Sequence, residues 1–143
     1  MIIAEVMNRN VKTIRPDDTV MDAVKVMNEN RIGSLVVIDG TGKLVGIITE
    51  RTILAEVVAK NKNSKKTKVE DIMATEVVTV APEMTLEEAA DLMCEKNIKK
   101  LPVIDKGELV GIVTASDLVA YESKLIDKVG KLLLTKSMQG FGG

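Results

Sequence analysis

The chain repeats itself after 66 residues, and this internal duplication constrains the fold more than any other feature of the sequence. The same residue recurs at positions 66 apart at Met7 and Met73, Thr13 and Thr79, Pro16 and Pro82, Met27 and Met93, Leu35 and Leu101, and Asp39 and Asp105. After Asp39 the register slips by one residue, a difference that a surface turn accommodates. Two copies of one supersecondary unit therefore account for nearly the whole chain.

Each copy has the same succession of hydrophobic patterns. Alternating or continuous apolar runs predict strands, and apolar residues spaced three and four apart predict helices. In the first copy the expected elements are a strand at 11–14, a helix around 20–27, strands at 32–38 and 44–48, and a helix at 50–60. A single copy is too short to bury much surface. The expected fold class is therefore α+β, with two βαββα repeats packed about a pseudo-twofold axis.

The expected domain organisation is repeat 1 at 1–60, a linker at 61–68, repeat 2 at 69–121, and a C-terminal helix and tail at 122–143. The linker contains four lysines and no apolar side chain. The last segment has more apolar positions than one domain face needs, so we expect part of it to form a homodimer interface. Gly130 is expected to bend or break this helix.

Chemistry-bearing residues gather where the last strand of each copy runs into a helix. In the second copy Thr114, Ser116 and Asp117 follow the apolar strand 109–113. The first N–H groups of a helix are unpaired and attract phosphate, and a nearby carboxylate can accept hydrogen bonds from sugar hydroxyls. The alternative is an ordinary junction in which Ser116 or Asp117 is the N-cap.

Composition excludes several classes of function. The chain has no histidine and one cysteine, which excludes Ser-His-Asp and Cys-His catalysis and most zinc sites. We therefore predict no catalytic residue, no metal site and no enzymatic activity. Cys94 is expected to be a small buried thiol on a helix. A single cysteine forms no internal disulfide, which fits the reducing cytoplasm.

The same counts bear on partners. A net charge of −1 and an aromatic content of 1% argue against nucleic-acid binding. No apolar run is long enough to span a bilayer, and residues 1–5 enter the first repeat without room for a signal peptide. We expect a cytoplasmic protein that does not associate with membranes.

The repeated motifs resemble the tandem CBS-domain pair, or Bateman module. The second copy carries VEDIM at 69–73, VTVAP at 78–82, LPVID at 101–105 and LVGIVTASD at 109–117. The first copy carries VM at 6–7, VKTIRP at 11–16, LVVID at 35–39 and LVGIITER at 44–51. The resemblance covers about residues 3–121. No single motif is specific, but the full set repeated in order is.

This resemblance implies a stand-alone regulatory module without a required cofactor. Its ligand would be AMP, ADP, ATP or S-adenosylmethionine, bound between the repeats, and occupancy would be signalled to an unidentified protein partner. The main site carried over from the family comprises Thr79, Val80, Pro82, Lys99, Lys100, Leu101, Pro102, Thr114, Ser116 and Asp117. Thr114 and Ser116 would lie near phosphate, and Asp117 would bind the ribose.

The remaining positions of this main site have less specific roles. Thr79, Val80 and Pro82 would flank the base. Lys99 and Lys100 would contact phosphate, or they form a solvated strand edge.

A weaker site is implied in the first copy. It comprises Thr13, Ile14, Pro16, Gly33, Ser34, Leu35, Thr49, Arg51 and Thr52. Thr52 stands where the family has Asp, so one charge-assisted bond is lost, at a cost of about 1.5–3 kcal/mol. Gly33 and Ser34 replace the lysine pair and remove positive charge. The alternative function is a dimerisation or interaction module with vestigial sites, which Thr52 favours and Thr114, Ser116 and Asp117 oppose.

Overall fold

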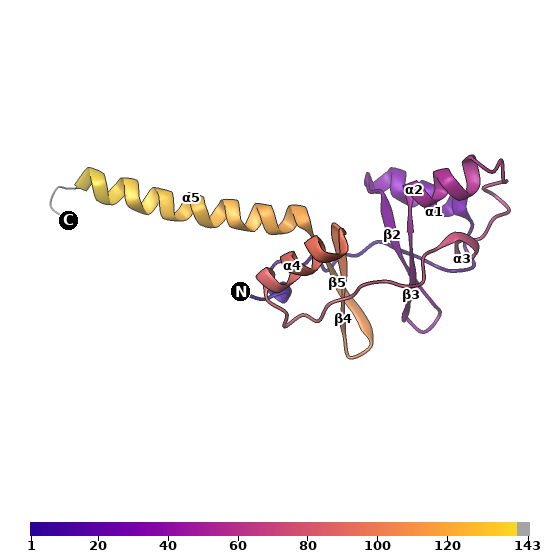
Figure 1. Ribbon diagram of the computed structural model, residues 1–143, viewed down its shortest axis with the longest axis horizontal. Helices are drawn as coiled ribbons and strands as arrows, with labels where there is room; N and C mark the ends of the chain where they lie inside the picture. Colours follow the sequence, from indigo (N-terminus) through magenta and orange to yellow (C-terminus); the bar gives the residue numbers. More distant parts are fainter. Residues whose placement is uncertain (140–143) are drawn as a thin grey trace.

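The structure is a computed structural model that describes residues 1–139. Figure 1 shows two neighbouring αβ bodies and one long helix that extends away from them. The first part of the chain forms η1 (Ile3–Glu5), β1 (Thr13–Ile14), α1 (Val20–Asn30), β2 (Ser34–Ile38), β3 (Leu44–Thr49), α2 (Glu50–Ile53) and the π-helical η2 (Leu54–Val58). The second part forms α3 (Val69–Ile72), α4 (Leu86–Lys96), β4 (Lys100–Asp105), β5 (Glu108–Thr114) and α5 (Ala115–Gln139).

The two halves contain equivalent sheets. In the first, β1 pairs in parallel with β2, which pairs antiparallel with β3. In the second, β4 and β5 form an antiparallel hairpin, and the opening strand is reduced to one parallel bridge between Val80 and Val103. The α+β fold class is thus confirmed, with a shorter opening strand in the second repeat than the pattern at 78–82 predicts.

Helices α1 and α4 begin in the same way. The Thr19 hydroxyl accepts from the Asp22 N–H at 3.1 Å, and the Asp22 carboxylate accepts from the Thr19 N–H at 3.0 Å. Thr85 and Glu88 form the same reciprocal box at α4. Each box satisfies N–H groups that have no partner within the helix. The helices then bury apolar residues against the cores, Val20, Ala23 and Met27 in α1 and Ala89 and Met93 in α4.

The short segments that lead into the two repeats, the first lead-in at 3–8 and the second lead-in at 69–74, are exchanged between the two cores. Ile3 and Met7 are buried in the core of the second repeat, whereas Val69 is buried in the core of the first. Asn8 exchanges two backbone hydrogen bonds of 2.9 Å with Ile112 of β5. Ala74 makes the equivalent pair of 2.9 Å bonds with Ile47 of β3. Each sheet is therefore extended by a residue from the opposite lead-in.

Two glycines allow these exchanged segments to lie against the strands. A Cβ at Gly46 would lie 2.7 Å from Met73 Sδ and 2.8 Å from the Ala74 carbonyl oxygen. A Cβ at Gly111 would lie 2.7 Å from Met7 Sδ and 3.1 Å from the Asn8 carbonyl oxygen. Only glycine admits a backbone this close to the middle of a strand.

The closing helices depart from the sequence expectation. In the first repeat the α-helix ends at Ile53 and one π-helical turn follows, instead of an α-helix that reaches Lys60. In the second repeat α5 is continuous through Gly130, so the predicted break there is wrong. One interior glycine costs about 1 kcal/mol, which a helix of 25 residues tolerates. The predicted tail after Gln139 lies outside the described residues.

Two further observations concern side chains and membranes. Cys94 is exposed, so the predicted burial of its thiol is wrong. Its neighbour Met93 takes the core-facing position on α4. No helix within residues 1–139 is long and apolar enough to cross a membrane.

Candidate functional site

A small cavity lies where the two repeats meet, on the side of the exchanged first lead-in. Its volume is about 140 Å³. The walls come from the segment before β1, from the region of β2 and from the paired ends of β4 and β5. The lining residues are Asn8, Asn10, Val11, Lys12, Ile32, Ser34, Val36, Lys100, Ile112 and Thr114.

One side chain crosses this cavity from the second repeat to the first. Lys100 Nζ donates to Ser34 Oγ at 3.0 Å, and both residues are partly buried. These two residues occupy equivalent positions, because Lys100 is the strand neighbour of Thr114 and Ser34 is the strand neighbour of Thr49. The Lys100 backbone therefore lies beside one strand–helix corner while its ammonium reaches toward the other. The Lys100 ammonium therefore supplies positive charge at the first repeat, where Ser34 stands in place of a lysine.

The corner at Thr114 is a reciprocal helix cap. The Thr114 N–H donates to Asp117 Oδ2 at 3.0 Å, and the Asp117 N–H donates to Thr114 Oγ1 at 3.1 Å. Thr114 is thus the capping residue of α5, and the alternative in which Ser116 or Asp117 is the N-cap is wrong. Ser116 is exposed. The cap uses one oxygen of the Asp117 carboxylate.

The equivalent corner of the first repeat lacks the carboxylate. The Thr49 hydroxyl donates to Thr52 Oγ1 at 3.0 Å, and the Thr52 N–H donates to Thr49 Oγ1 at 3.2 Å. The two hydroxyls therefore bond to each other. Arg51 is exposed beside them.

Several predicted site residues belong to the protein core instead. Ile14 and Leu35 are buried in the first core, and Val80 and Leu101 are buried in the second. The Pro102 side chain is also fully buried. Leu101 and Pro102 are consecutive on β4, so their side chains point to opposite faces of the sheet, and both faces are covered there. A bound ligand could meet them only through their backbones.

The remaining predicted residues are spread over the surface around the corners. The carbonyls of Pro16 and Pro82 accept from Glu70 and Ala4 at 3.0 Å and so hold the exchanged lead-ins. Thr79 is exposed.

The other three residues lie elsewhere. Thr13 lines a separate hollow of about 460 Å³ near the two hairpin turns. The carbonyls of Gly33 and Lys99 accept from the first N–H of α2 and of α5, respectively.

The cavity brings together part of each predicted set. Of the main set, Lys100 and Thr114 line the cavity, and Ser34 joins them from the set assigned to the weaker site. The first strand of the second repeat, at Thr79, Val80 and Pro82, is not among the lining residues. The reason is the exchange of lead-ins, which places the segment from Asn8 to Lys12 beside β5.

Asn8, Asn10 and Lys12 line the cavity but are not among the residues predicted from the sequence. The signal that could have found this segment is Gly111, since a glycine inside an apolar strand marks a place where another backbone comes close.

The comparisons with known proteins agree with the duplication. The family profile described as CBS domain matches residues 3–59 and again residues 69–124. The uncharacterized protein MK0525 of Methanopyrus kandleri is 38% identical over 125 residues, which are 87% of this chain and 64% of that protein. The CBS domain-containing protein YhcV of Bacillus subtilis is 34% identical over 116 residues, 81% of each chain.

A solved structure shares the architecture. The hexameric CBS-CP12 protein from bloom-forming cyanobacteria superimposes with a TM-score of 0.73 at 37% identity. The match covers 83% of this chain and 66% of that chain.

Proposed function

This chain belongs to the CBS-domain family as a tandem pair, and we propose on that basis that it is a regulatory module for an adenine nucleotide or other adenosyl ligand. The ligand binds between the repeats, and its occupancy is signalled to a protein partner. The observation that carries the proposal is the Lys100 ammonium, which lies in a cavity between the repeats next to the capped end of α5.

The cavity offers complementary chemistry to the parts of a nucleotide. Lys100 and Lys12 supply positive charge next to the N-terminus of α5, an arrangement that suits phosphate. Val11 and Ile112, which are partly buried, supply apolar surface for a base. Asp117 lies in the first turn of α5, where its carboxylate can accept from ribose hydroxyls.

The size of the cavity suggests how binding becomes a signal. Ligand pockets commonly measure about 300–1,000 Å³, whereas this cavity measures about 140 Å³. A nucleotide therefore has to widen the junction and draw Lys100 away from Ser34. Because that bond joins the two repeats, occupancy and the packing of the repeats are coupled, and the ligand shifts the population of the open arrangement.

We also propose that the module acts as a homodimer and regulates a protein that is yet to be identified. The CBS-CP12 protein is a hexamer, so this family uses self-association. The described surface of this chain exposes ten large hydrophobic side chains, more than scattered surface residues require.

The direct test is calorimetric titration of the full chain with AMP, ADP, ATP and S-adenosylmethionine. We expect saturable binding of at least one of them. Lys100→Met should weaken a phosphate-bearing ligand by about tenfold or more, because a charge-assisted bond is lost. Lys96→Met is the control, since Lys96 is exposed in the last turn of α4, outside the cavity, and it should leave affinity unchanged.

A second pair of variants addresses the two corners. Asp117→Asn should weaken every adenosyl ligand, because it removes charge from the ribose acceptor. Thr52→Asp should strengthen binding in the first repeat for the converse reason. If none of the four ligands binds and the chain is still a stable dimer, the sensor is excluded. The vestigial interaction module, which the bonded Thr49 and Thr52 hydroxyls favour, then replaces it.

A further inference from the structure

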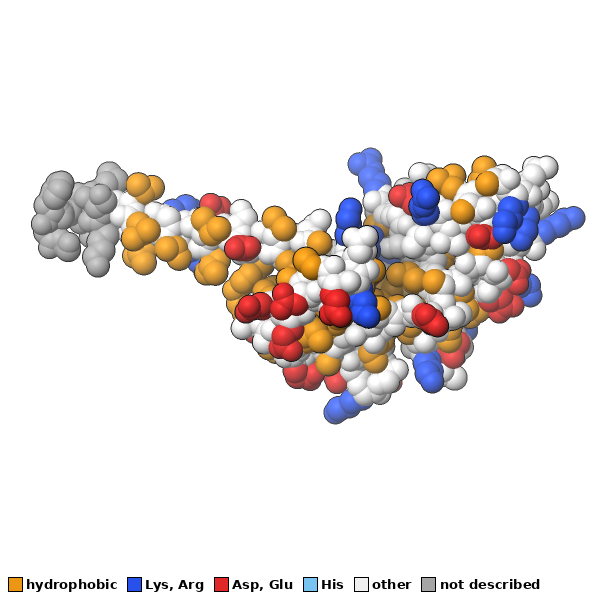
Figure 2. Space-filling view, in the orientation of Figure 1, with side chains coloured by type: hydrophobic (Ala, Val, Ile, Leu, Met, Phe, Trp, Pro, Cys, Tyr) orange, Lys and Arg blue, Asp and Glu red, His pale blue; other side chains and the backbone are white. Residues whose placement is uncertain are grey.

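Helix α5 carries an apolar stripe that nothing in the rest of the described chain covers. After its first turns on the second repeat, the helix extends away from the body (Figure 1), and orange side chains follow its length in Figure 2. Leu125, Ile126, Leu132 and Leu133 are exposed by 49%, 62%, 65% and 62%. An isolated helix is marginally stable in water unless an amphipathic face is packed. The stripe therefore calls for a partner.

The spacing of the stripe identifies the shape of that partner. Apolar pairs recur every seven residues at 118–119, 125–126 and 132–133, with Val129 between the last two pairs. A seven-residue repeat keeps one seam of a helix facing another helix and imposes a left-handed supercoil. A membrane surface or a flat sheet requires no such period.

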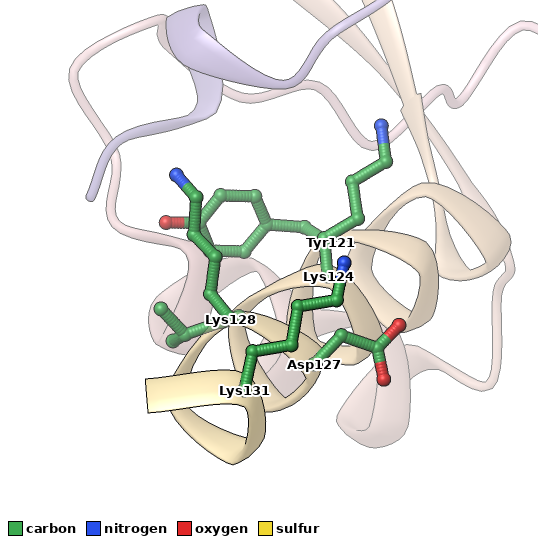
Figure 3. A pocket seen from close by; sticks show the side chains of 6 residues that line it. Tyr121, Lys124, Asp127, Lys128 and Lys131 are labelled. Carbon is green, nitrogen blue, oxygen red and sulfur yellow. The ribbon is translucent and has the colours of Figure 1, made fainter. Parts of the chain in front are cut away.

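The polar face of α5 lies to one side of this stripe. Figure 3 shows Tyr121, Lys124, Asp127, Lys128 and Lys131 around a hollow of about 410 Å³ along the helix. Asp127 lines this hollow together with the three lysines. Mixed charge of this kind flanks the seam of a soluble helix pair.

We propose that α5 pairs with α5 of a second copy of this chain, in antiparallel orientation. The charge distribution carries the choice of partner. Glu122, Val129 and Lys136 are spaced seven residues apart, so these three positions share the face of α5 that carries the stripe. Antiparallel pairing centred near Val129 sets the position of Glu122 in one helix against that of Lys136 in the other, and it does so twice, so the helix is complementary to itself.

The stripe also continues an existing contact. Leu118 packs against the core of the second repeat, and its face of the helix runs on into Leu125, Val129 and Leu132. The start of α5 is thus held by its own body, and the part beyond it is available to the partner. The overlap is consequently centred near Val129. This inference rests on the proposed homodimer and assigns its surface.

The test compares two adjacent leucines in the full chain. Leu133 belongs to the seam, whereas Leu134 lies about 100° further round the helix, off the stripe, and is similarly exposed, at 65%. Sedimentation equilibrium should show a dimer for the wild type and for Leu134→Glu. Leu133→Glu should weaken the dimer by at least about a hundredfold, because two leucines would be replaced at the seam by two carboxylates. Ile126→Glu serves as a second seam variant.

The outcomes separate this inference from the proposed function. A dimer that survives both seam variants overturns the pairing of α5 but leaves a homodimer, with exposed Leu54 and Val58 of η2 as the next surface to examine. A monomeric wild type overturns both the seam and the homodimer. A monomer that binds anionic vesicles through Leu133 makes the stripe a membrane-surface helix instead. Nucleotide titration should be the same for Leu133→Glu and the wild type.

Disulfide cross-linking tests the orientation in a Cys94→Ser background. Val129→Cys should link two copies, because the centre of an antiparallel pair meets itself. Val119→Cys should not self-link. A parallel pair would link at both positions, which would overturn the antiparallel arrangement.

Discussion

Substitution of Gly46 by alanine tests how the two repeats are joined. The new methyl group would lie 2.7 Å from Met73 Sδ and 2.8 Å from the Ala74 carbonyl oxygen. The methionine side chain can rotate away, but the carbonyl is fixed by the paired 2.9 Å bonds between Ala74 and Ile47. We therefore expect the exchanged segment to be forced away from β3.

The magnitude follows from three contributions. Overpacking in a well-packed region costs about 1–3 kcal/mol. Weakening of the two backbone bonds costs a further 0.5–1.5 kcal/mol or so each. Alanine restricts the unfolded chain and offsets roughly 0.4–1 kcal/mol. The net expectation is a loss of about 2–4 kcal/mol in the free energy of unfolding.

Urea unfolding followed by circular dichroism measures this loss. With a slope of about 1–3 kcal/mol per molar urea, the midpoint of Gly46→Ala should fall by about 1 M or more. Gly111→Ala should lose less, because its nearest carbonyl, that of Asn8, is 3.1 Å away. Gly130→Ala has no neighbour within 4 Å and should raise stability by about 0.5–1 kcal/mol.

A double variant decides which contact matters. If Met73→Ala fully restores the stability of Gly46→Ala, the sulfur atom and not the crossing backbone is the constraint. If Gly46→Ala is as stable as Gly130→Ala, the exchanged segment does not lie against β3, and the account of the junction is refuted.

Three further predictions follow from burial and local hydrogen bonds. Leu101→Ala should cost about 2–5 kcal/mol because Leu101 is fully buried, whereas Leu54→Ala at an exposed position should change the urea midpoint little. The hydrogen bonds from the Thr19 backbone and hydroxyl lower the pKa of Asp22. Its stabilising contribution is therefore present above the carboxyl's unfolded pKa and is lost as pH falls through the lowered value. Carbon-detected NMR titration should show this pKa moving back toward normal in Thr19→Val. Cys94 is exposed and should react with a thiol reagent in the native protein, and a thiol that reacts only after denaturation would contradict this.

The parts of the site that are local in sequence could be predicted, and the parts created by packing could not. Thr114 and Asp117 are three residues apart at a strand–helix junction, so their proximity follows from the chain itself. Asn8 and Lys12 reach the same cavity only because the lead-in crosses to the other sheet. Periodicity describes which face of a segment is buried but not which core buries it.

Two local predictions, at Cys94 and at Gly130, were wrong. Met93 and Cys94 are adjacent on an amphipathic helix, and packing of α4 decided which one faces the core. A glycine in a helix lowers stability without enforcing a break, so Gly130 could not define the end of α5.

The contact between Lys100 and Ser34 bears on how many ligands a chain of two similar halves can hold. Duplication produced two corresponding strand–helix corners. Of the equivalent positions 34 and 100, only Lys100 is positively charged. Its backbone is next to Thr114, and its ammonium is bonded to the strand neighbour of Thr49. In the proposed sensor, a phosphate at either corner would draw on the same ammonium, and a second phosphate at the other corner would meet a charge that is already engaged. For phosphate ligands we therefore expect the two halves to be anticooperative, with the first equivalent binding more tightly than the second.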